Sequence, residues 1–429
     1  MMRISGGTTV DLVLIGKALI EGSFLEAAVA IDDGVIVGIS KPSLAPNSVS
    51  RVEFGEKFLL LPGMVDIHVH MREPGLEYKE DWGSGSRAAV KGGVTMVVDM
   101  PNNVPPANNC SVLQEKLQRA SARSLVDFAF YAGFNPLVEE LERCRGLFVG
   151  FKLYPEDLYS PGARNVFSYA SRYGLPVVVH AENPSLFRES KLHSDARPPE
   201  AEESAVKHAL MLSRESNAWL HVTHLSTSGA LMSVLEAKVT PGGRVTFDVT
   251  PHHCLLSDEL YRGEKRGIAV VNPPLRPEGE RASIYTSLRN MLPDAIVTDH
   301  APHRVEEKTS EKPSPGFPGL ETALHLLFRE ILEGRLGLEV LELYSRRPAR
   351  LLGVKKGVLG EGFEGDVVVV SKEEWVVRGE DFESKAKYSP FEGWRLSTKT
   401  YAVYIRGEPV YIAGQFMTSK GGRLAVPRG

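Results

Sequence analysis

Between Leu60 and Arg350, eight short apolar runs alternate with helix-like stretches. The runs are Met64–His70, Met96–Met100, Phe128–Phe134, Val149–Tyr154, Val177–His180, Trp219–Leu225, Val245–Val249 and Ala295–Thr298. They are rich in β-branched and aromatic residues, as are strands buried on both faces of a parallel sheet. The stretches Ser111–Arg123, Glu200–Arg214 and Leu320–Glu333 are typical of helices. Eight strands alternating with helices predict an α/β fold, a (β/α)8 TIM barrel.

The segments on either side of this block have a different pattern. Residues 10–57 and 357–427 carry short strands of alternating polarity with Asp-Gly and Arg-Gly-Glu turns. Neither segment is long enough to bury much of a core by itself. The sequence therefore predicts one small β-sandwich domain formed by residues 1–60 and 353–429, beside a barrel of residues 61–352. Two separate hairpin extensions are the alternative.

Composition narrows the class of protein. The chain has 429 residues and a formal net charge of -4, which is too balanced for a nucleic-acid binder. Its partners are expected to be small molecules or other subunits. The three cysteines, Cys110, Cys144 and Cys254, are odd in number and form no CxxC pair. This argues against a disulfide framework and a thiolate zinc site, and it favours a reducing cytoplasm. No apolar run is long enough to span a membrane.

Ionisable residues stand where the expected strands end, which is where barrel enzymes carry their chemistry. His68 and His70 are two residues apart on one strand and therefore point the same way. The candidate metal ligands at the strand ends are His68, His70, Lys152, His180, His224 and Asp299. A lone histidine at a strand end is usually a hydrogen-bonded core residue, but several together with a carboxylate are the ligands that zinc prefers. Six candidates exceed the needs of one tetrahedral ion, so the pattern predicts two Zn²⁺.

The other histidines are weaker candidates. His221 and His224 are three apart on one strand and cannot share a face, and His224 lies nearer the strand's end. His221 is therefore expected to be structural. The same is expected of His193, His208 and His325, which fall in loop or helix contexts. Spacing leaves His252, His253 and Cys254 undecided.

Lys152 is unusual because it lies inside the apolar run "VGFKLY". Burying an unpaired ammonium is costly, so the side chain must reach solvent or become neutral. Desolvation and neighbouring cations favour the neutral amine. A neutral amine can react with carbon dioxide to form a carbamate, an anionic oxygen ligand able to bridge two metal ions. Among four histidines and an aspartate, this is the favoured interpretation.

These residues belong to an ordered set of motifs: "DIHVHMREPG", "DMPNN", "GFKLY", "VVVHAEN", "THLSTSGA", "DVTPHH", "NPPLR", "TDHAPH" and "GFPGLET". Together they resemble the dihydroorotase family of the cyclic amidohydrolases, in its type I, carboxylated-lysine branch. HxH by itself is a weak signal, but the ordered set is specific. The resemblance implies one zinc on His68, His70 and Asp299, and a second on His180 and His224. Carboxylated Lys152 and a hydroxide would bridge the two ions.

The resemblance also implies a substrate. Dihydroorotases similar to this chain place an arginine two residues after the HxH pair, here Arg72, where it binds the ring carboxylate with Asn102 and His303. An arginine offers a bidentate fork for a carboxylate. Asn272, Pro318 and Gly319 match segments that hold the pyrimidine ring. One departure is Asn103, where many relatives have Thr; it leaves Asn102 intact.

The expected reaction is the reversible cyclisation of N-carbamoyl-L-aspartate to (S)-dihydroorotate and water in pyrimidine biosynthesis, with Asp299 as the catalytic proton carrier. The alternatives are an allantoinase or hydantoinase on the same scaffold, or a non-catalytic relative. Allantoinases and hydantoinases usually have another residue at the Arg72 position. A homodimer and an association with an aspartate transcarbamoylase are also compatible with the family. The polar residues 304–315 are expected to order over substrate, with a solvated connector as the alternative.

Overall fold

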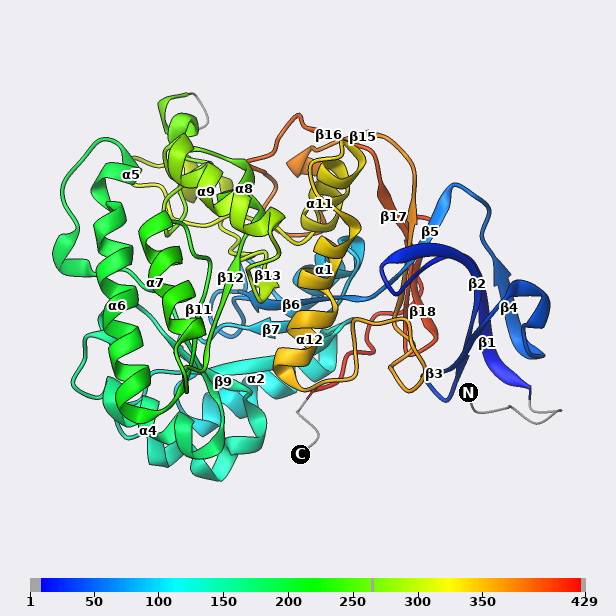
Figure 1. The fold of residues 1–429 in the computed structure, drawn as a ribbon, viewed down its shortest axis with the longest axis horizontal. Helices are drawn as coiled ribbons and strands as arrows, with labels where there is room; N and C mark the ends of the chain where they lie inside the picture. The colour runs from blue at the N-terminus through cyan, green and yellow to red at the C-terminus, as the bar shows by residue number, and fades with distance from the viewer. Residues whose placement is uncertain (1–8, 264–265, 426–429) are drawn as a thin grey trace.

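The computed structural model describes residues 9–263 and 266–425, and its larger part is a barrel of parallel strands (Figure 1). The strands are β6 (Met64–Val69), β7 (Val94–Asp99), β8 (Asp127–Gly133), β9 (Gly150–Leu153), β10 (Pro176–Val179), β11 (Trp219–Val222), β12 (Val245–Val249) and β13 (Ala295–Ile296). They form an 8-stranded sheet in chain order, so all eight expected strands and the barrel are confirmed.

Side-chain and bridge contacts close the barrel between β6 and the short strand β13. The backbone N–H of His70 donates to the carbonyl of His300 at 2.8 Å, and Val69 forms a β-bridge with His300. Asp66 on β6 accepts hydrogen bonds from the backbone N–H of Thr298 and the hydroxyl of Tyr344. Burial raises the pKa of this Asp66 carboxyl to about 7, although these bonds oppose the rise.

Helices surround the barrel. The longer ones are α1 (Trp82–Lys91), α2 (Cys110–Arg123), α4 (Ala163–Tyr173), α6 (Pro199–Ser216), α7 (Ser228–Val239), α9 (Glu278–Arg289), α11 (Ala323–Leu332) and α12 (Arg346–Leu352). Short helices α3 (Pro155–Leu158), α5 (His193–Ala196), α8 (Pro251–Leu255) and α10 (Val305–Thr309) follow strand ends or lie in loops. Local sequence sets their ends: Asp81 caps α1 through the Ser84 N–H, and Asn217 ends α6 in the left-handed conformation. The three helices expected from sequence are α2, α6 and α11.

The two ends of the chain meet in one nine-stranded sheet beside the barrel (Figure 1). Its strands are β1 (Val10–Ile20), β2 (Ser23–Asp32), β3 (Val35–Ser40), β4 (Ser48–Glu53), β5 (Phe58–Pro62), β14 (Val367–Ser371), β17 (Lys399–Ile405), β18 (Glu408–Ile412) and β19 (Gln415–Phe416). Antiparallel pairing of β5 with β14 joins the N-terminal and C-terminal halves, so the alternative of two separate hairpins is wrong. The strands form a single hydrogen-bonded sheet around a shared apolar cluster.

Part of the C-terminal segment leaves this sheet. The short strands β15 (Trp375–Val376) and β16 (Arg395–Leu396) pair with each other and form a separate two-stranded sheet. Val377 and Phe382 are buried in an apolar cluster with residues of the barrel loops such as Leu256. The expected assignment of all residues after 353 to the β-domain is therefore too simple, because these apolar side chains are covered by the barrel. Residues 1–8 and 426–429 of the expected domain lie outside the described residues.

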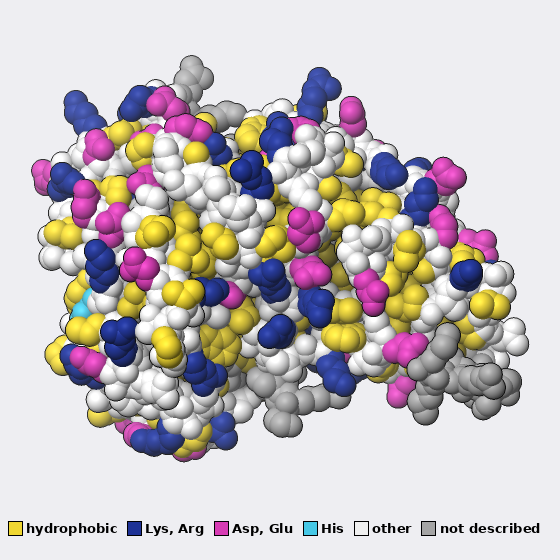
Figure 2. All heavy atoms as spheres, in the orientation of Figure 1, with side chains coloured by type: hydrophobic (Ala, Val, Ile, Leu, Met, Phe, Trp, Pro, Cys, Tyr) yellow, Lys and Arg dark blue, Asp and Glu magenta, His cyan; other side chains and the backbone are white. Residues whose placement is uncertain are grey.

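The surface carries charged groups of both signs. Figure 2 shows Lys and Arg interspersed with Asp and Glu over this face, in keeping with the small net charge. Among the described residues, no helix is both long and apolar enough to cross a membrane.

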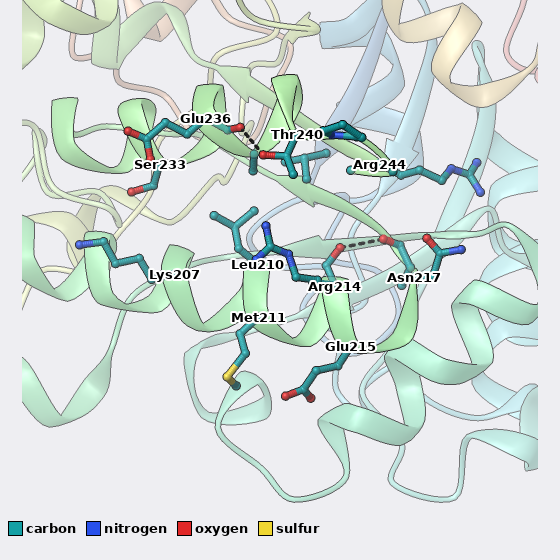
Figure 3. Close-up of a pocket in the computed structure, with 17 residues that line it drawn as sticks. Lys207, Leu210, Met211, Arg214, Glu215, Asn217, Ser233, Glu236, Thr240 and Arg244 are labelled. Carbon is teal, nitrogen blue, oxygen red and sulfur yellow. Dashed lines mark hydrogen bonds between the residues drawn. The ribbon is translucent and has the colours of Figure 1, made fainter.

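A groove of about 630 Å³ lies between α6 and α7 (Figure 3). It is lined by Met211, Arg214 and Glu236 and reaches Val245, the first residue of β12. Because Val245 begins a barrel strand, the groove lies toward the N-terminal ends of the strands. Stability rather than catalysis is the usual role of that end of a barrel.

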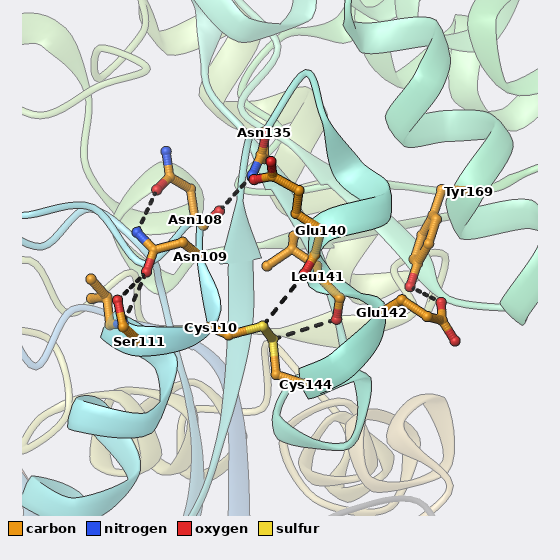
Figure 4. Close-up of a disulfide and its surroundings, with 11 residues drawn as sticks. Asn108, Asn109, Cys110, Ser111, Asn135, Glu140, Leu141, Glu142, Cys144 and Tyr169 are labelled. Carbon is orange, nitrogen blue, oxygen red and sulfur yellow. Dashed lines mark hydrogen bonds between the residues drawn. A yellow bond between two sulfur atoms is a disulfide. The ribbon is translucent and has the colours of Figure 1, made fainter.

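The structure corrects the expectation that the cysteines are unpaired. Cys110 and Cys144 form a disulfide, with Cα atoms 5.6 Å apart (Figure 4). Cys110 is the first residue of α2, and Cys144 lies in the 3-10 segment Val138–Leu147. The barrel places these segments side by side although 34 residues separate the cysteines along the chain. Cys254 is free and buried, and burial raises the pKa of its thiol.

We expect the disulfide to stabilise the fold by restricting the unfolded chain. Replacing Cys110 and Cys144 together with Ser should lower the free energy of unfolding by about 2–4 kcal/mol. The measurement is denaturant unfolding with and without dithiothreitol. Reductant should destabilise the parent and leave the double variant unchanged; equal sensitivity of both proteins would contradict the assignment.

Candidate active site

A cavity of about 430 Å³ opens at the C-terminal ends of the barrel strands. Its walls contain His68, His70, Arg72, Asn102, Lys152, Tyr154, Pro155, Glu156, His180, Arg197, His224, Val271, Asn272, Asp299, Ala301, His303, Pro315 and Gly316. All six candidate metal ligands are in this set. They come from β6, β9, β10, β11 and β13 or the residues that follow these strands, so barrel closure brings together side chains that are far apart in sequence.

His68, His70 and Asp299 form the tightest group. Their ligand atoms lie within 4.8 Å of one another, as a metal ion requires of its ligands, and all three side chains are buried. The Nε2 atoms of His68 and His70 lie 3.2 Å and 3.1 Å from Asp299 Oδ1. The Nδ1 atom of His70 lies 2.6 Å from Asn102 Oδ1 and that of His68 lies 2.6 Å from Thr223 Oγ1. Because the Nδ1 atoms of both rings contact these oxygen atoms, the Nε2 atoms face the Asp299 carboxylate.

His180 and His224 lie beside this group. The His224 ring centroid is 5.2 Å from that of His68 and 4.5 Å from that of His180. His180 Nε2 lies 2.6 Å from the Glu182 carboxylate, so its Nδ1 is the nitrogen available to a ligand. His224 Nδ1 is buried and has no hydrogen-bond partner within the described part of the chain. Burial lowers the pKa of both imidazoles, which favours the neutral form that binds metals.

Lys152 Nζ is fully buried and has no hydrogen-bond partner among the described residues. Burial lowers the pKa of this ammonium to about 7, although Asp299 and Asp248 oppose the change. A substantial fraction of the side chain is therefore the neutral amine at neutral pH. The Lys152 amine thus lacks a partner in a cavity that also contains four imidazoles and a carboxylate. Adding an anionic group to this amine would fit a site that holds cations.

Three residues of the cavity have strained backbones. The φ angles of Arg72, His224 and Asp299 are 64°, 42° and 47°, in the left-handed region that non-glycine residues avoid. Each such residue costs on the order of 1–3 kcal/mol, and such strain is concentrated at functional sites.

Arg72 lines the same cavity and is buried. Its Nε donates to the Pro302 carbonyl at 3.2 Å, and its Nη2 lies 3.2 Å from His303 Nε2. His303 in turn contacts Lys79 Nζ through Nδ1 at 3.1 Å. Burial and the cations of Arg72 and Lys79 lower the pKa of His303 to about 2, so this imidazole is neutral. No carboxylate pairs with Arg72 among the described residues, which leaves its charge available to a ligand.

The structure separates the remaining candidates for substrate contacts. Asn102 and Asn272 line the cavity, although each uses its Oδ1, against His70 and His193 respectively. Pro318 and Gly319 are not among the lining residues, whereas Pro315 and Gly316 of the same segment are. The Gly319 N–H instead donates to His300 Nδ1 at 3.3 Å. The segment therefore reaches the cavity through Pro315 and Gly316, and ring contacts by Pro318 and Gly319 stay predictions.

Three lining residues with polar side chains were not predicted from the sequence: Tyr154, Glu156 and Arg197. Tyr154 Oη is buried without a hydrogen-bond partner in the described chain. Arg197 Nε donates to Glu182 Oε1 at 3.0 Å, and so links the cavity wall to the partner of His180. Tyr154 and Glu156 directly follow β9, so the strand-end rule could have found them. Arg197, in an irregular loop, had no such signal.

The undecided histidines lie outside the cavity lining. His253 contacts Thr250 Oγ1 and the Pro273 carbonyl, each at 2.9 Å. His252 packs its ring 4.7 Å from that of Phe317. His221 faces Asp248 and Thr246.

In the loop 304–315, α10 covers the start of the segment and Glu307 pairs with Lys79 at 2.8 Å. Closure of this loop over substrate stays a prediction.

Comparisons with known proteins place these features in context. The model of the amidohydrolase family matches residues 59–410. A dihydroorotase of Methanothermobacter thermautotrophicus is 37% identical over 92% of this chain and 94% of its own length. One of Pyrococcus abyssi is 35% identical over 98% and 99%. Among solved structures, L-hydantoinase (dihydropyrimidinase) from Arthrobacter aurescens has a TM-score of 0.89 and 26% identity, covering 97% of this chain and 99% of that one.

The buried amine of Lys152 should destabilise the metal-free protein. Its pKa falls from 10.5 in the unfolded chain to about 7 on folding, so the unfolded chain holds the extra proton between these values. The penalty is complete below about pH 7 and disappears as the pH rises toward 10.5. Lys152→Met should therefore be more stable than the parent by a few kcal/mol near pH 7, with the gain shrinking by pH 9.5.

Denaturant unfolding of chelator-treated protein at the two pH values measures this difference. Lys399→Met is the matched control, because Lys399 is exposed and should show no pH-dependent gain. A Lys152→Met variant that is less stable than the parent at neutral pH would contradict the prediction.

Proposed function

Because the chain belongs to the amidohydrolase family, and to the dihydroorotases within it, we propose that it interconverts N-carbamoyl-L-aspartate and (S)-dihydroorotate with release or uptake of water. The observation that carries the choice of substrate is Arg72, a buried guanidinium in the wall of the ligand cavity with no carboxylate partner among the described residues. Dihydroorotate offers a ring carboxylate that this cation can bind.

We further propose that the cavity holds two zinc ions. His68, His70 and Asp299 would hold one, and His180 and His224 the other. The Lys152 amine would add to carbon dioxide with loss of one proton, and the resulting carbamate would serve both ions. This is supported by the donor set and by the two buried nitrogens, Lys152 Nζ and His224 Nδ1, that have no hydrogen-bond partner in the described chain. When bound, such ions lower the pKa of coordinated water and polarise a carbonyl oxygen.

The side chains then divide the remaining tasks. Arg72 orients the substrate through the substrate's carboxylate, helped by the amide group of Asn102 and by neutral His303. Asp299 lies at the centre of the ligand group and can take a proton from the attacking water and deliver it to the departing ring nitrogen. In the direction of ring closure, the same carboxylate returns the proton. Asn272, Pro318 and Gly319 stay predicted ring contacts, the last two through their loop.

A hydantoinase-type activity is the second candidate, because L-hydantoinase shares the fold over nearly the whole chain. Uncharged cyclic amides would leave the Arg72 cation buried without a counter-charge, which is unfavourable. A non-catalytic scaffold is disfavoured because all six candidate ligands line one cavity.

Other predictions extend this proposal. We also predict a cytoplasmic location, a homodimer and an association with an aspartate transcarbamoylase. The boundaries of the barrel, 61–352, and of the N-terminal β-domain segment, 1–60, stay predictions.

The activity is tested with the zinc-loaded protein and three substrates: dihydroorotate, hydantoin and allantoin. We expect turnover of dihydroorotate, with inhibition by orotate, and two zinc equivalents per chain. Preferred turnover of hydantoin or allantoin would establish the alternative, and one equivalent in fully active enzyme would contradict the two-ion centre.

Arg72→Met tests the substrate assignment. Loss of a charge-assisted contact in a desolvated pocket costs on the order of 2–5 kcal/mol. Its kcat/KM for dihydroorotate should therefore fall roughly 30-fold or more. Metal content should not change, since Arg72 is not a proposed ligand. A variant that loses zinc, or that keeps full activity, would make Arg72 structural.

A further inference from the structure

A buried carboxylate, Asp248, lies behind the candidate metal ligands and outside the cavity lining. It belongs to β12, and it contacts three groups of the neighbouring segment: one on β11 and two from the residues that directly follow that strand. Thr223 Oγ1 donates to its Oδ2 at 3.0 Å, His221 Nε2 lies 2.7 Å from Oδ2, and the backbone N–H of His224 donates to Oδ1 at 2.5 Å. Its exposed fraction is 1%, so these protein groups replace water around the charge.

Only one placement of the hydrogen atoms satisfies all of these contacts. An ionised carboxylate only accepts, so each of the three partners must donate to it. A threonine hydroxyl has a single hydrogen, and Asp248 takes it. Thr223 Oγ1 can then only accept from its other neighbour, His68 Nδ1, at 2.6 Å. His68 must therefore carry its proton on Nδ1.

This tautomer decides what the other side of the ring can do. With the proton on Nδ1, His68 Nε2 presents a lone pair toward Asp299 Oδ1, 3.2 Å away. A bare nitrogen and a carboxylate oxygen at that distance repel each other unless a cation lies between them. In the opposite tautomer, Nε2–H would donate to Asp299 and neither atom would be free for an ion.

We propose that Asp248, acting through Thr223, is a positioning residue that holds His68 in the Nδ1–H tautomer and so keeps Nε2 ready to bind a metal ion. The same carboxylate anchors the backbone of His224, whose φ of 42° is strained, and so supports a ligand candidate of each ion. The proposal rests on the proposed metal centre for its purpose, but the tautomer itself can be measured without metal or substrate.

Asp248→Asn is the most informative variant. The amide that replaces the carboxylate brings its own N–H donor next to three groups that already donate to this position. At least one of these contacts must therefore rearrange. If the amide donates to Thr223 Oγ1, the hydroxyl hydrogen turns toward His68 Nδ1 and forces the proton to Nε2. Loss of the correct tautomer by an Asp-to-Asn change behind a histidine strongly reduces activity in other enzymes.

Thr223 offers a matched pair of variants. Thr223→Ser keeps the hydroxyl and should preserve the tautomer, whereas Thr223→Val keeps the shape and removes the hydroxyl. The tautomer is read from nitrogen-15 NMR shifts of the His68 ring in metal-free protein labelled at histidine, with His68→Gln identifying its signals. Zinc affinity is measured by competition with a chelator, and melting temperatures show that each variant is folded.

We expect the Nδ1–H form in the parent and in Thr223→Ser, and loss of that preference in Asp248→Asn and Thr223→Val. Zinc affinity should fall roughly 10–100-fold in the last two variants. An Nε2–H tautomer in the parent, or an unchanged tautomer in folded Asp248→Asn, would overturn the proposal. A parent with the Nδ1–H tautomer but no turnover of dihydroorotate would instead count against the proposed function alone.

Discussion

The burial of ionisable side chains at one end of the barrel is the constraint on which the rest of the structure depends. Lys152, His68 and His224 are almost fully buried, and a buried polar group that lacks a partner is costly. The fold reduces this cost by placing acceptors behind the rings, such as Thr223 behind His68 and Asn102 behind His70. Three buried polar atoms that still lack a hydrogen-bond partner among the described residues, Lys152 Nζ, Tyr154 Oη and His224 Nδ1, belong to side chains that line the cavity at this end of the barrel.

Polar contacts next to the candidate ligands also hold the barrel closed. β13 is only two residues long, and in place of a full ladder with β6 the structure uses the Asp66 carboxylate on Thr298 and the backbone contact of His70 with His300. His70 makes one of these closing contacts itself, and Asp299 lies between the two closing residues Thr298 and His300. Because the closing contacts and the candidate ligands share backbone, a change in barrel closure would move the site, and the strained φ of Asp299 is held by the same segment.

The cavities show that size does not locate chemistry. The groove between α6 and α7 is larger than the cavity at the strand ends, yet among the described residues only His68, His70 and Asp299 form a group of three suited to a metal. The smaller cavity is distinguished by the low pKa values of its imidazoles and by the partnerless amine of Lys152.

The sequence by itself determined the barrel, its eight strands and the six candidate ligands, because strand periodicity and strand ends are local properties that a parallel barrel converts into one common site. The same rule, that residues after strand ends face the site, also predicts the position of Tyr154. Only the tertiary structure decided the contacts between distant segments: the Cys110–Cys144 disulfide, the pairing of β5 with β14 that joins the two ends of the chain, and the position of Asp248 behind Thr223. These contacts depend on which surfaces pack together. The number of residues between two segments does not tell how far apart they lie in the folded protein.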